Sequence, residues 1–339
     1  MANFSTSNLV KAQALLNERF QAPELREQQI PVLNLGRQNS EIIIPSHQTL
    51  RTREDRAIEA YIISRNKRTT TGSSRTYNHT GTIGDSISVN LVWTSFVDKF
   101  KMSLKLLDNN MLEANQVLAN QFEQCFQNIR NDVEQFLITY LLSEKTQVNI
   151  ATKNGEWNDT DFVFEIESTT EKGLFFEDAK SMMRQNYYNG LYDVIADSTL
   201  YRNARFYAAQ GSSNAVNTAF QFSGMNIRES IGLTDSDYTA GVGLFLPVNT
   251  FAVLDWIPRQ NRQGLGNYNT YLGGYGSIID PISGMTFAVH GYSQRADTSA
   301  TNGSRQDDVI EFEVSIDLSP NLAPLSTEDE TVVFEVAQV

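Results

Sequence analysis

The side chains that most often carry catalysis are few and scattered in this sequence of 339 residues. Its three histidines, His47, His79 and His290, share no spacing suited to a metal ion. Cys125 is the one cysteine, so neither a thiolate pair for zinc nor an internal disulfide can form. Lone histidines and a lone apolar-face cysteine are typical of structural side chains, and we interpret these four residues that way.

Glycine-rich and acidic segments lead to the same expectation. Gly264–Gly266 and Gly273–Gly276 lack the strand–turn–helix setting of a nucleotide or phosphate loop, and no Gly-x-Ser-x-Gly elbow is present. Asp235 and Asp237 lie in the segment TDSD, and two carboxylates in a loop are usually solvated rather than bound to a metal ion. The sequence therefore predicts a protein that is not an enzyme and that has no catalytic, metal-binding or cofactor-binding residues.

Charge is distributed unevenly along the chain, whose net charge is -13. Residues 1–110 hold 14 Lys and Arg against 10 Asp and Glu, whereas the remaining 229 residues hold 13 against 30. An acidic body of this kind predicts weak or no specific DNA binding, because phosphates require a basic surface. No apolar run reaches the roughly 18 residues that would span a bilayer, so we expect no membrane partner.

The basic residues gather around a predicted hairpin. Ile62–Arg68 and Thr80–Thr94 bracket a polar tract rich in Thr, Ser and Gly, which is typical of a hairpin tip, and the returning strand alternates apolar and polar residues. A long two-stranded ribbon is marginally stable by itself, so we expect it to rest on another subunit. The residues expected at contacts between subunits are Arg51, Arg53, Arg56, Arg65, Lys67, Arg68, Arg75, Tyr77 and Trp93. The alternative is a flexible surface hairpin.

A long helix is the element around which the rest is arranged. No glycine occurs between Gly84 and Gly155, and apolar residues from Leu107 to Tyr140 recur three or four positions apart. This spacing predicts a helix from Met111 to Glu144, roughly 50 Å long. Its polar side carries mostly amides, which favours a helix laid across a sheet over a coiled coil. An ordinary buried helix of a globular enzyme remains the alternative.

The flanking segments complete an α+β protein. Residues 3–20 predict a short amphipathic helix, and residues 34–48 predict an extended arm that must lie on the body or on a neighbouring chain. After the long helix come a strand at residues 162–168, a helix at 175–185, a strand at 191–196 and a further helix to 209, which indicate a compact α/β subdomain. Short strands and two well-patterned final strands follow, with a Pro-rich link at Pro320–Pro324.

The order of arm, basic hairpin, long helix, α/β insert and returning strands resembles the Hong Kong 97-type major capsid protein of tailed bacteriophages. The segment FSGMNIRES is also similar to a strand–Gly–strand–Ser step of that family. The resemblance covers nearly the whole chain and implies an amino-terminal arm at residues 1–58, an extended loop hairpin at 59–97, a peripheral domain with the spine helix at 98–172 and 308–339, and an axial domain at 173–307. Some members join neighbours through a Lys–Asn bond; Lys67 is the lysine on this loop, and its partner stays open.

The function that the resemblance implies is a major capsid protein. It would self-assemble into pentamers and hexamers that form an icosahedral phage head around double-stranded DNA, uncleaved and with separate scaffolding, portal and decoration proteins. Its location would be the virion, after assembly in the host cytoplasm. The alternatives are an encapsulin-like compartment shell protein, a phage tail subunit such as a sheath protein, and an enzyme whose site is not evident.

Overall fold

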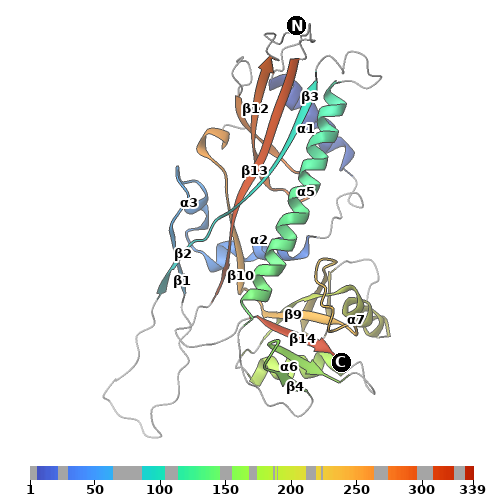
Figure 1. Cartoon of the computed structure of the whole chain (residues 1–339). Coiled ribbons are helices and arrows are strands. Elements are labelled where there is room, and N and C mark those ends of the chain that lie inside the picture. The colour runs from blue at the N-terminus through green and yellow to red at the C-terminus, as the bar shows by residue number, and fades with distance from the viewer. Residues whose placement is uncertain are drawn as a thin grey trace, which may run out of the picture.

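The chain folds into two sheets joined by one long helix (Figure 1). The computed structural model describes residues 6–21, 30–63, 86–103, 114–145, 155–167, 174–185, 188, 190–210, 219–222, 224–262, 274–295, 308–323 and 333–339. One sheet has five strands, the other has seven, and a two-stranded ribbon extends beside the first. The protein is therefore α+β, as the sequence predicts.

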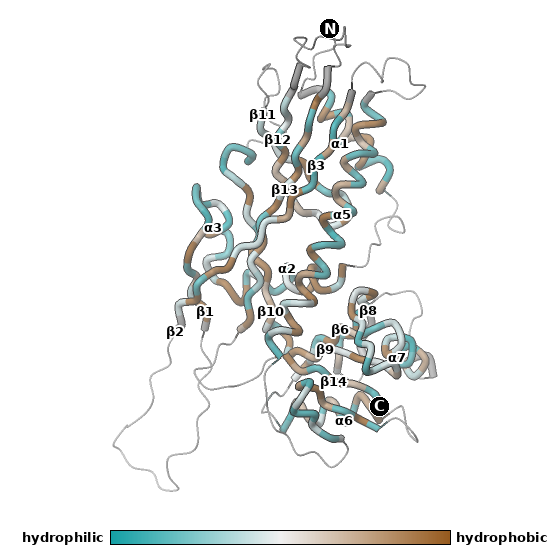
Figure 2. Tube along the Cα trace, viewed as in Figure 1, coloured by the Kyte–Doolittle hydropathy of each residue, from teal (hydrophilic) through white to brown (hydrophobic). Residues whose placement is uncertain are grey.

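Helix α5 spans Ala114–Ser143; it lies along the five-stranded sheet, and its carboxyl-terminal end reaches the seven-stranded sheet (Figure 1). Its 30 residues correspond to about 45 Å. The predicted apolar stripe is buried from Leu118 to Val133, and brown and teal alternate along the helix in Figure 2. Further on, Leu137 and Leu141 are buried in place of the expected Phe136 and Tyr140, which are half-buried. The stripe drifts because 3.6 residues per turn does not match a strict seven-residue repeat.

The five-stranded sheet is antiparallel and packs its apolar face on α5. Its members are β3 (Thr94–Ser103), β10 (Phe251–Trp256), β11 (Gly274–Ile279), β12 (Thr286–Arg295) and β13 (Asp308–Leu322). Along β13 every second residue is buried, and Phe312 contacts Phe100 of β3 and Phe122 of α5 with ring centroids 5.0 and 5.6 Å away. The two-residue period of a strand thus sends Phe312 into the core and Glu311 and Glu313 to the opposite face.

Strand β13 continues through Pro320, where the sequence predicts a link. Past Leu318 its one described neighbour is β10, in which Val253 lies opposite Pro320. Val253 turns both backbone groups toward Ser40, whose hydroxyl donates to the Val253 carbonyl at 2.8 Å and accepts from its N–H at 3.3 Å. The pair is therefore one without mutual hydrogen bonds, so Pro320 costs the ladder no donor.

The seven-stranded sheet forms the second part, the lower one in Figure 1. Its order is β4 (Glu156–Asn158), β5 (Val163–Ile166), β14 (Phe334–Gln338), β9 (Val242–Pro247), β6 (Tyr192–Ala196), β8 (Met225–Glu229) and β7 (Ala219–Phe222). Helices α6 (Phe175–Gln185) and α7 (Ser198–Gln210) share one apolar cluster with it. On the other face, Ile195 and Leu244 join the cluster of α5. Burial on both faces explains why the predicted wet face of β5 is reduced to Glu165.

Strand pairing groups the chain differently from the predicted domains. Strands β10, β11 and β12, which fall in residues 173–307, lie in the same sheet as β3 and β13, whereas β4, β5 and β14 lie in the sheet of β6. The chain crosses between sheets directly after β9, in a turn where Asn249 takes a φ of 62°, a left-handed conformation that asparagine tolerates. Neighbours in sequence therefore enter different sheets, which a division into contiguous segments does not anticipate.

The amino-terminal segment is helical where an extended arm was expected. Helix α1 (Thr6–Arg19) confirms the predicted amphipathic helix and packs on α5, but residues 34–48 belong to α2 (Pro31–Ile43) and α3 (His47–Arg51). Proline at the first position of α2 suits a helix start. At Gly36 a Cβ would overlap the Val253 side chain, so this glycine lets α2 lie directly on β10. The Pro and Gly that suggested an irregular arm thus serve a closely packed helix.

Candidate assembly interface at the hairpin base

The base of the predicted hairpin is an antiparallel ribbon. Strand β1 (Glu59–Ile63) pairs with β2 (Ser86–Asn90), and Tyr61 lies opposite Ser88. Both strands are on the side of the five-stranded sheet away from α5 (Figure 1). The ribbon is therefore confirmed at its base, while the predicted tip, residues 64–85, falls outside the described residues.

The inner face of the ribbon is packed on its own chain. Ala60, Ile62 and Leu91 are buried with Leu50 of α3 and Leu254 of β10 in one apolar cluster. Alternation along each strand directs these side chains to one face. The expectation that the ribbon rests on another subunit is therefore wrong for its described base, which packs on this chain's own sheet. The arm segment, expected on the body or on a neighbouring chain, lies on the body as α2 and α3.

The outer face of the ribbon exposes Tyr61, and two further apolar side chains are exposed next to the ends of its strands. Tyr61 is 63% exposed, and Ile58 and Val92, which flank the two strands, are each 75% exposed. Glu59 lies beside Tyr61 on this face and accepts a hydrogen bond from the Ser88 hydroxyl at 3.2 Å. Large apolar side chains exposed on one part of a protein are typical of a surface that another molecule covers.

Several residues expected at contacts between subunits make contacts within the chain. Arg51 pairs with the nearly buried Asp255 at 2.6 Å, and Arg56 lies 3.7 Å from Asp317. Trp93 is half-buried and donates its indole N–H to the Ala57 carbonyl at 2.8 Å. Arg51 and Arg56 therefore tie the segment before the ribbon to the five-stranded sheet, and Trp93 joins the two sides of the ribbon base.

Of the remaining predicted contact residues, one is described and exposed, and five lie outside the described residues. Arg53 is exposed, and its carbonyl accepts hydrogen bonds from Trp256 at 3.2 Å and Arg262 at 2.7 Å. Arg65, Lys67, Arg68, Arg75 and Tyr77 lie outside the described part of the chain.

Sequence reasoning missed Arg262, which ties the segment before the ribbon to the sheet. Its guanidinium lies 5.4 Å from the centroid of the Trp256 ring and donates to the carbonyls of Thr52 and Arg53. Its neighbour Arg259 forms an ion pair with Glu54. About two hundred residues separate these partners, so no local spacing in the sequence signals the contact.

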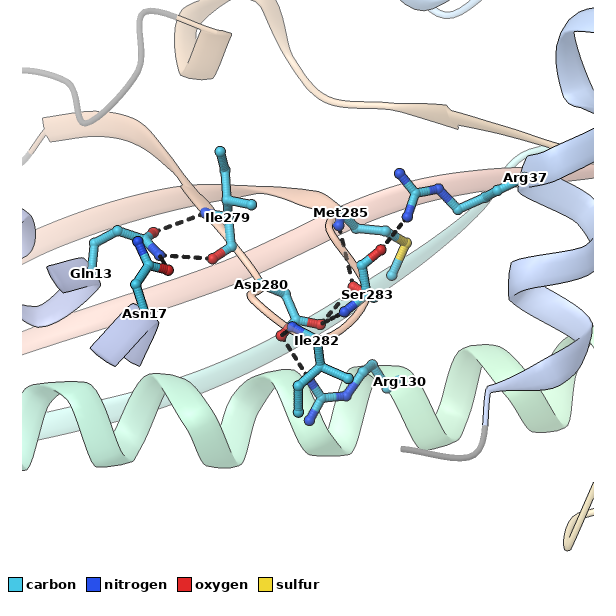
Figure 3. Close-up of polar contacts among 9 residues, drawn as sticks. All are labelled: Gln13, Asn17, Arg37, Arg130, Ile279, Asp280, Ile282, Ser283 and Met285. Atoms are coloured by element: carbon cyan, nitrogen blue, oxygen red, sulfur yellow. Dashed lines mark hydrogen bonds and ion pairs between the residues drawn. The ribbon is translucent and has the colours of Figure 1, made fainter. Parts of the chain in front are cut away.

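A second polar cluster joins α5 to the turn between β11 and β12 (Figure 3). Arg130 donates to Asp280 at 2.6 Å, and these side chains are only 3% and 0% exposed. Asp280 also accepts from the Ser283 hydroxyl at 2.5 Å and from the Ile282 and Ser283 amides. Arg37 of α2 donates to the Ser283 carbonyl. The turn thus connects α5 and α2 to the five-stranded sheet.

The edge strand β11 is closed by a side chain of α1 (Figure 3). Gln13 accepts a hydrogen bond from the Ile279 N–H and donates one to its carbonyl, both at 3.0 Å. The amide side chain thus imitates a neighbouring strand at this position, which is one way to block unwanted edge pairing.

Glu134 of α5 holds the start of α2. Its carboxylate accepts hydrogen bonds from the amides of Val32 at 3.0 Å and Leu33 at 3.1 Å, which are free at a helix start. Burial raises the pKa of Glu134 to about 7, and the two amide hydrogen bonds oppose that rise. The arm is therefore attached to the spine through a carboxyl group that titrates near neutral pH.

This attachment predicts a pH-dependent stability. Because the folded pKa of Glu134 lies above its ordinary 4.5, its contribution is fully present below pH 4.5 and is lost as pH rises through about 7. The loss is about 3 kcal/mol at most. Urea unfolding of the unassembled protein from pH 4.5 to 8 is expected to show a smaller loss for Glu134→Gln than for wild type. Equal losses in both proteins would contradict this role.

The side chains weighed for catalysis occupy structural positions where they are described. His47 is buried, and burial lowers its pKa; His290 stacks on Tyr275 with ring centroids 4.7 Å apart. Burial also raises the pKa of the Cys125 thiol. Across the described ranges, no group of three or more His, Cys, Asp or Glu is placed to hold a metal ion, and none of the helices is long and apolar enough to cross a membrane.

Known structures with a similar arrangement include viral and compartment shells. The chain is similar to the capsid of cyanophage P-SCSP1u, at 10% identity over 85% of each chain with a TM-score of 0.43. It is similar to a structure from Mycobacterium phage Cain at 12% identity, covering 84% of this chain and 86% of that one, with a TM-score of 0.45. The holo-SrpI encapsulin complex from Synechococcus elongatus PCC 7942 matches at 10% identity over 75% and 76%, with a TM-score of 0.41. No family model and no curated protein matches the sequence.

Proposed function

We propose that this chain is a major capsid protein that assembles into pentamers and hexamers and forms an icosahedral phage head around double-stranded DNA. The observation that carries the proposal is the two-sided ribbon of β1 and β2. Its inner face is fixed to the body, and its outer face presents Tyr61, with Ile58 and Val92 exposed beside it. A surface of this kind is stable in isolation yet keeps apolar area for a neighbour.

Repetition of one apolar contact around a shell can stabilise the assembly. Fully burying one large apolar side chain contributes about 1.5–3 kcal/mol. When only two copies associate, the free-energy cost of association offsets most of this gain. In a closed shell every copy makes the same contact twice, once with the neighbour on each side. Weak contacts that repeat in this way favour a closed assembly over isolated pairs.

The two sheets support a revised division into capsid domains. The five-stranded sheet with α1, α2 and α5 corresponds to a peripheral domain, and the seven-stranded sheet with α6 and α7 corresponds to an axial domain. The ribbon corresponds to the extended loop. This division replaces the contiguous ranges 98–172, 173–307 and 308–339 with groups that share a hydrogen-bonded sheet.

The other properties of the proposal follow from that role. The protein acts without catalysis or a cofactor, its main partners are other copies of itself, and separate scaffolding, portal and decoration proteins complete the head. Its acidic body is consistent with weak contact to packaged DNA. The proposed location is the virion, after assembly in the host cytoplasm.

Electron microscopy of the purified chain tests the proposal. Expression of the full sequence is expected to yield closed isometric particles in negative stain, because each copy carries its own contact surfaces. Particles that contain protein cargo and no nucleic acid would instead identify an encapsulin-like shell, and tubes would identify a tail component. A protein that stays monomeric at high concentration, in the presence of crowding agents, would contradict all three assemblies.

A further inference from the structure

The outward side of α7 is basic and exposed to solvent. The helix packs on the seven-stranded sheet through its buried side chains Leu200, Tyr201 and Ala204. On its other side Arg202, Arg205 and Phe206 are exposed, and their spacing of three and four residues places them on one stripe. Phe206 is 62% exposed, and the helix contains two arginines and no Asp or Glu.

Aromatic contacts arrange this stripe before any partner arrives. The Arg205 guanidinium lies 5.8 Å from the centroid of the Tyr201 ring, a cation–π distance. The Phe206 ring meets Tyr207 edge to face, with centroids 5.8 Å apart. Side chains held in this way lose less conformational entropy when a partner covers them.

The opposite edge of the same sheet is acidic. Residues 155–167, which contain the terminal strand β4 and its neighbour β5, include no Lys or Arg and carry five acids: Glu156, Asp159, Asp161, Glu165 and Glu167. Hydrogen bonds hold two of these carboxylates in place. Asn158 donates to Asp161 at 3.0 Å and to Glu165 at 2.8 Å, and the Tyr238 hydroxyl donates to Glu165 at 2.8 Å.

The two surfaces cannot meet within one copy. Helix α7 packs on β9, β6 and β8, toward the β7 edge, whereas β4 forms the far edge of the sheet. Figure 1 shows α7 on one side of the lower part and β4 on another. A contact between complementary patches on opposite edges is head-to-tail, and a head-to-tail contact that closes by rotation forms a ring.

We propose that α7 of one copy binds the β4–β5 edge of the next copy and thereby links the seven-stranded sheets into a ring. In this contact Arg202 and Arg205 of one copy face the acidic edge of the next copy, and Phe206 supplies an apolar contact between the two copies. This inference rests on the proposed shell function and names the surfaces that join its capsomers. The occupant of the α7 face is a second copy because this chain itself carries the acidic surface that matches it.

Charge reversal on both surfaces tests the pairing. The double variant Arg202→Glu/Arg205→Glu is expected to need at least about a tenfold higher protein concentration to form rings and shells, because attraction becomes repulsion at every contact. Asp159→Lys/Asp161→Lys is expected to have the same effect. The chain that carries all four substitutions is expected to recover assembly. Ring formation is measured by analytical ultracentrifugation, and shell formation by negative-stain microscopy.

A matched control separates local pairing from net charge. Lys99→Glu/Lys101→Glu makes the same change in net charge on the exposed face of β3 and is expected to leave ring formation unchanged. Normal ring formation by the α7 variant, failure of the fourfold variant to recover, or an equal defect in the control would each overturn the inference. If the wild type forms rings but no shells and the α7 variant loses the rings, the shell function fails while this contact stands. If the wild type forms neither, both fail.

Discussion

Replacing Arg130 with methionine is expected to destabilise the protein by about 3–5 kcal/mol, because it leaves Asp280 charged and buried without its cation. Asp280 is fully buried and bridges α5 to the β11–β12 turn, so no solvent can take the place of the guanidinium. Methionine keeps much of the arginine's apolar stem, which limits the effect of lost packing. Urea unfolding of the unassembled protein, followed by circular dichroism, measures the change.

An exposed ion pair provides the comparison. Lys99 lies 2.9 Å from Glu313 on the open face of the sheet, and Lys99→Met is expected to cost less than about 1 kcal/mol because solvent screens that pair. Equal midpoints for Arg130→Met and Lys99→Met would show that the buried pair contributes no more than a surface pair. A large loss only for Arg130→Met would establish the turn as a junction between the spine helix and the sheet.

Deleting Lys67–Gly81 is expected to abolish closed particles while the chain still folds. The described base of the ribbon is held by its own apolar cluster, and Trp93 and Arg51 fix the segments on either side of it. The fold therefore does not depend on the deleted tract, whereas the proposed reach to a neighbouring copy does. Circular dichroism is expected to match wild type, and negative-stain fields are expected to lack shells.

A replacement of equal length sharpens this experiment. Exchanging Lys67–Gly81 for a Gly/Ser tract keeps the chain connection but removes Lys67, Arg68, Arg75 and Tyr77. Loss of particles in both variants would assign the contact to these side chains. Normal particles from the deletion would show that the tract is a surface loop without a role in assembly.

Ion pairs within one copy neutralise part of the charge difference between the basic amino-terminal segment and the acidic remainder of the chain. Arg51 and Arg56 neutralise Asp255 and Asp317 of the same chain, so these arginines are not available as simple positive charges for a neighbour. The proposed contact between copies uses the α7 face in place of these two arginines. The predicted contacts between subunits stay a prediction, and the structure adds that two of the predicted arginines, Arg51 and Arg56, have acidic partners within the chain.

The sequence alone determined those helices and strands whose pattern of apolar residues is complete within the element itself. Helices α5 and α1 follow from apolar residues that repeat every three to four positions, and the base of the ribbon follows from alternation every two positions. Strand β6 follows from a short buried run, and all these patterns are complete within about 5 to 30 residues. The thin supply of histidine and cysteine likewise indicated structural positions, which His47, His290 and Cys125 occupy.

Tertiary structure decided everything that joins distant segments. The crossing of β9 and β10 into different sheets, the helical state of α2, and the pairing of Arg130 with Asp280 depend on partners up to two hundred residues away. Helix α2 is stabilised by burial on β10 and by Glu134 of α5 rather than by its own propensity. Periodicity shows that a residue must be buried, but the face that buries it is set by packing in three dimensions.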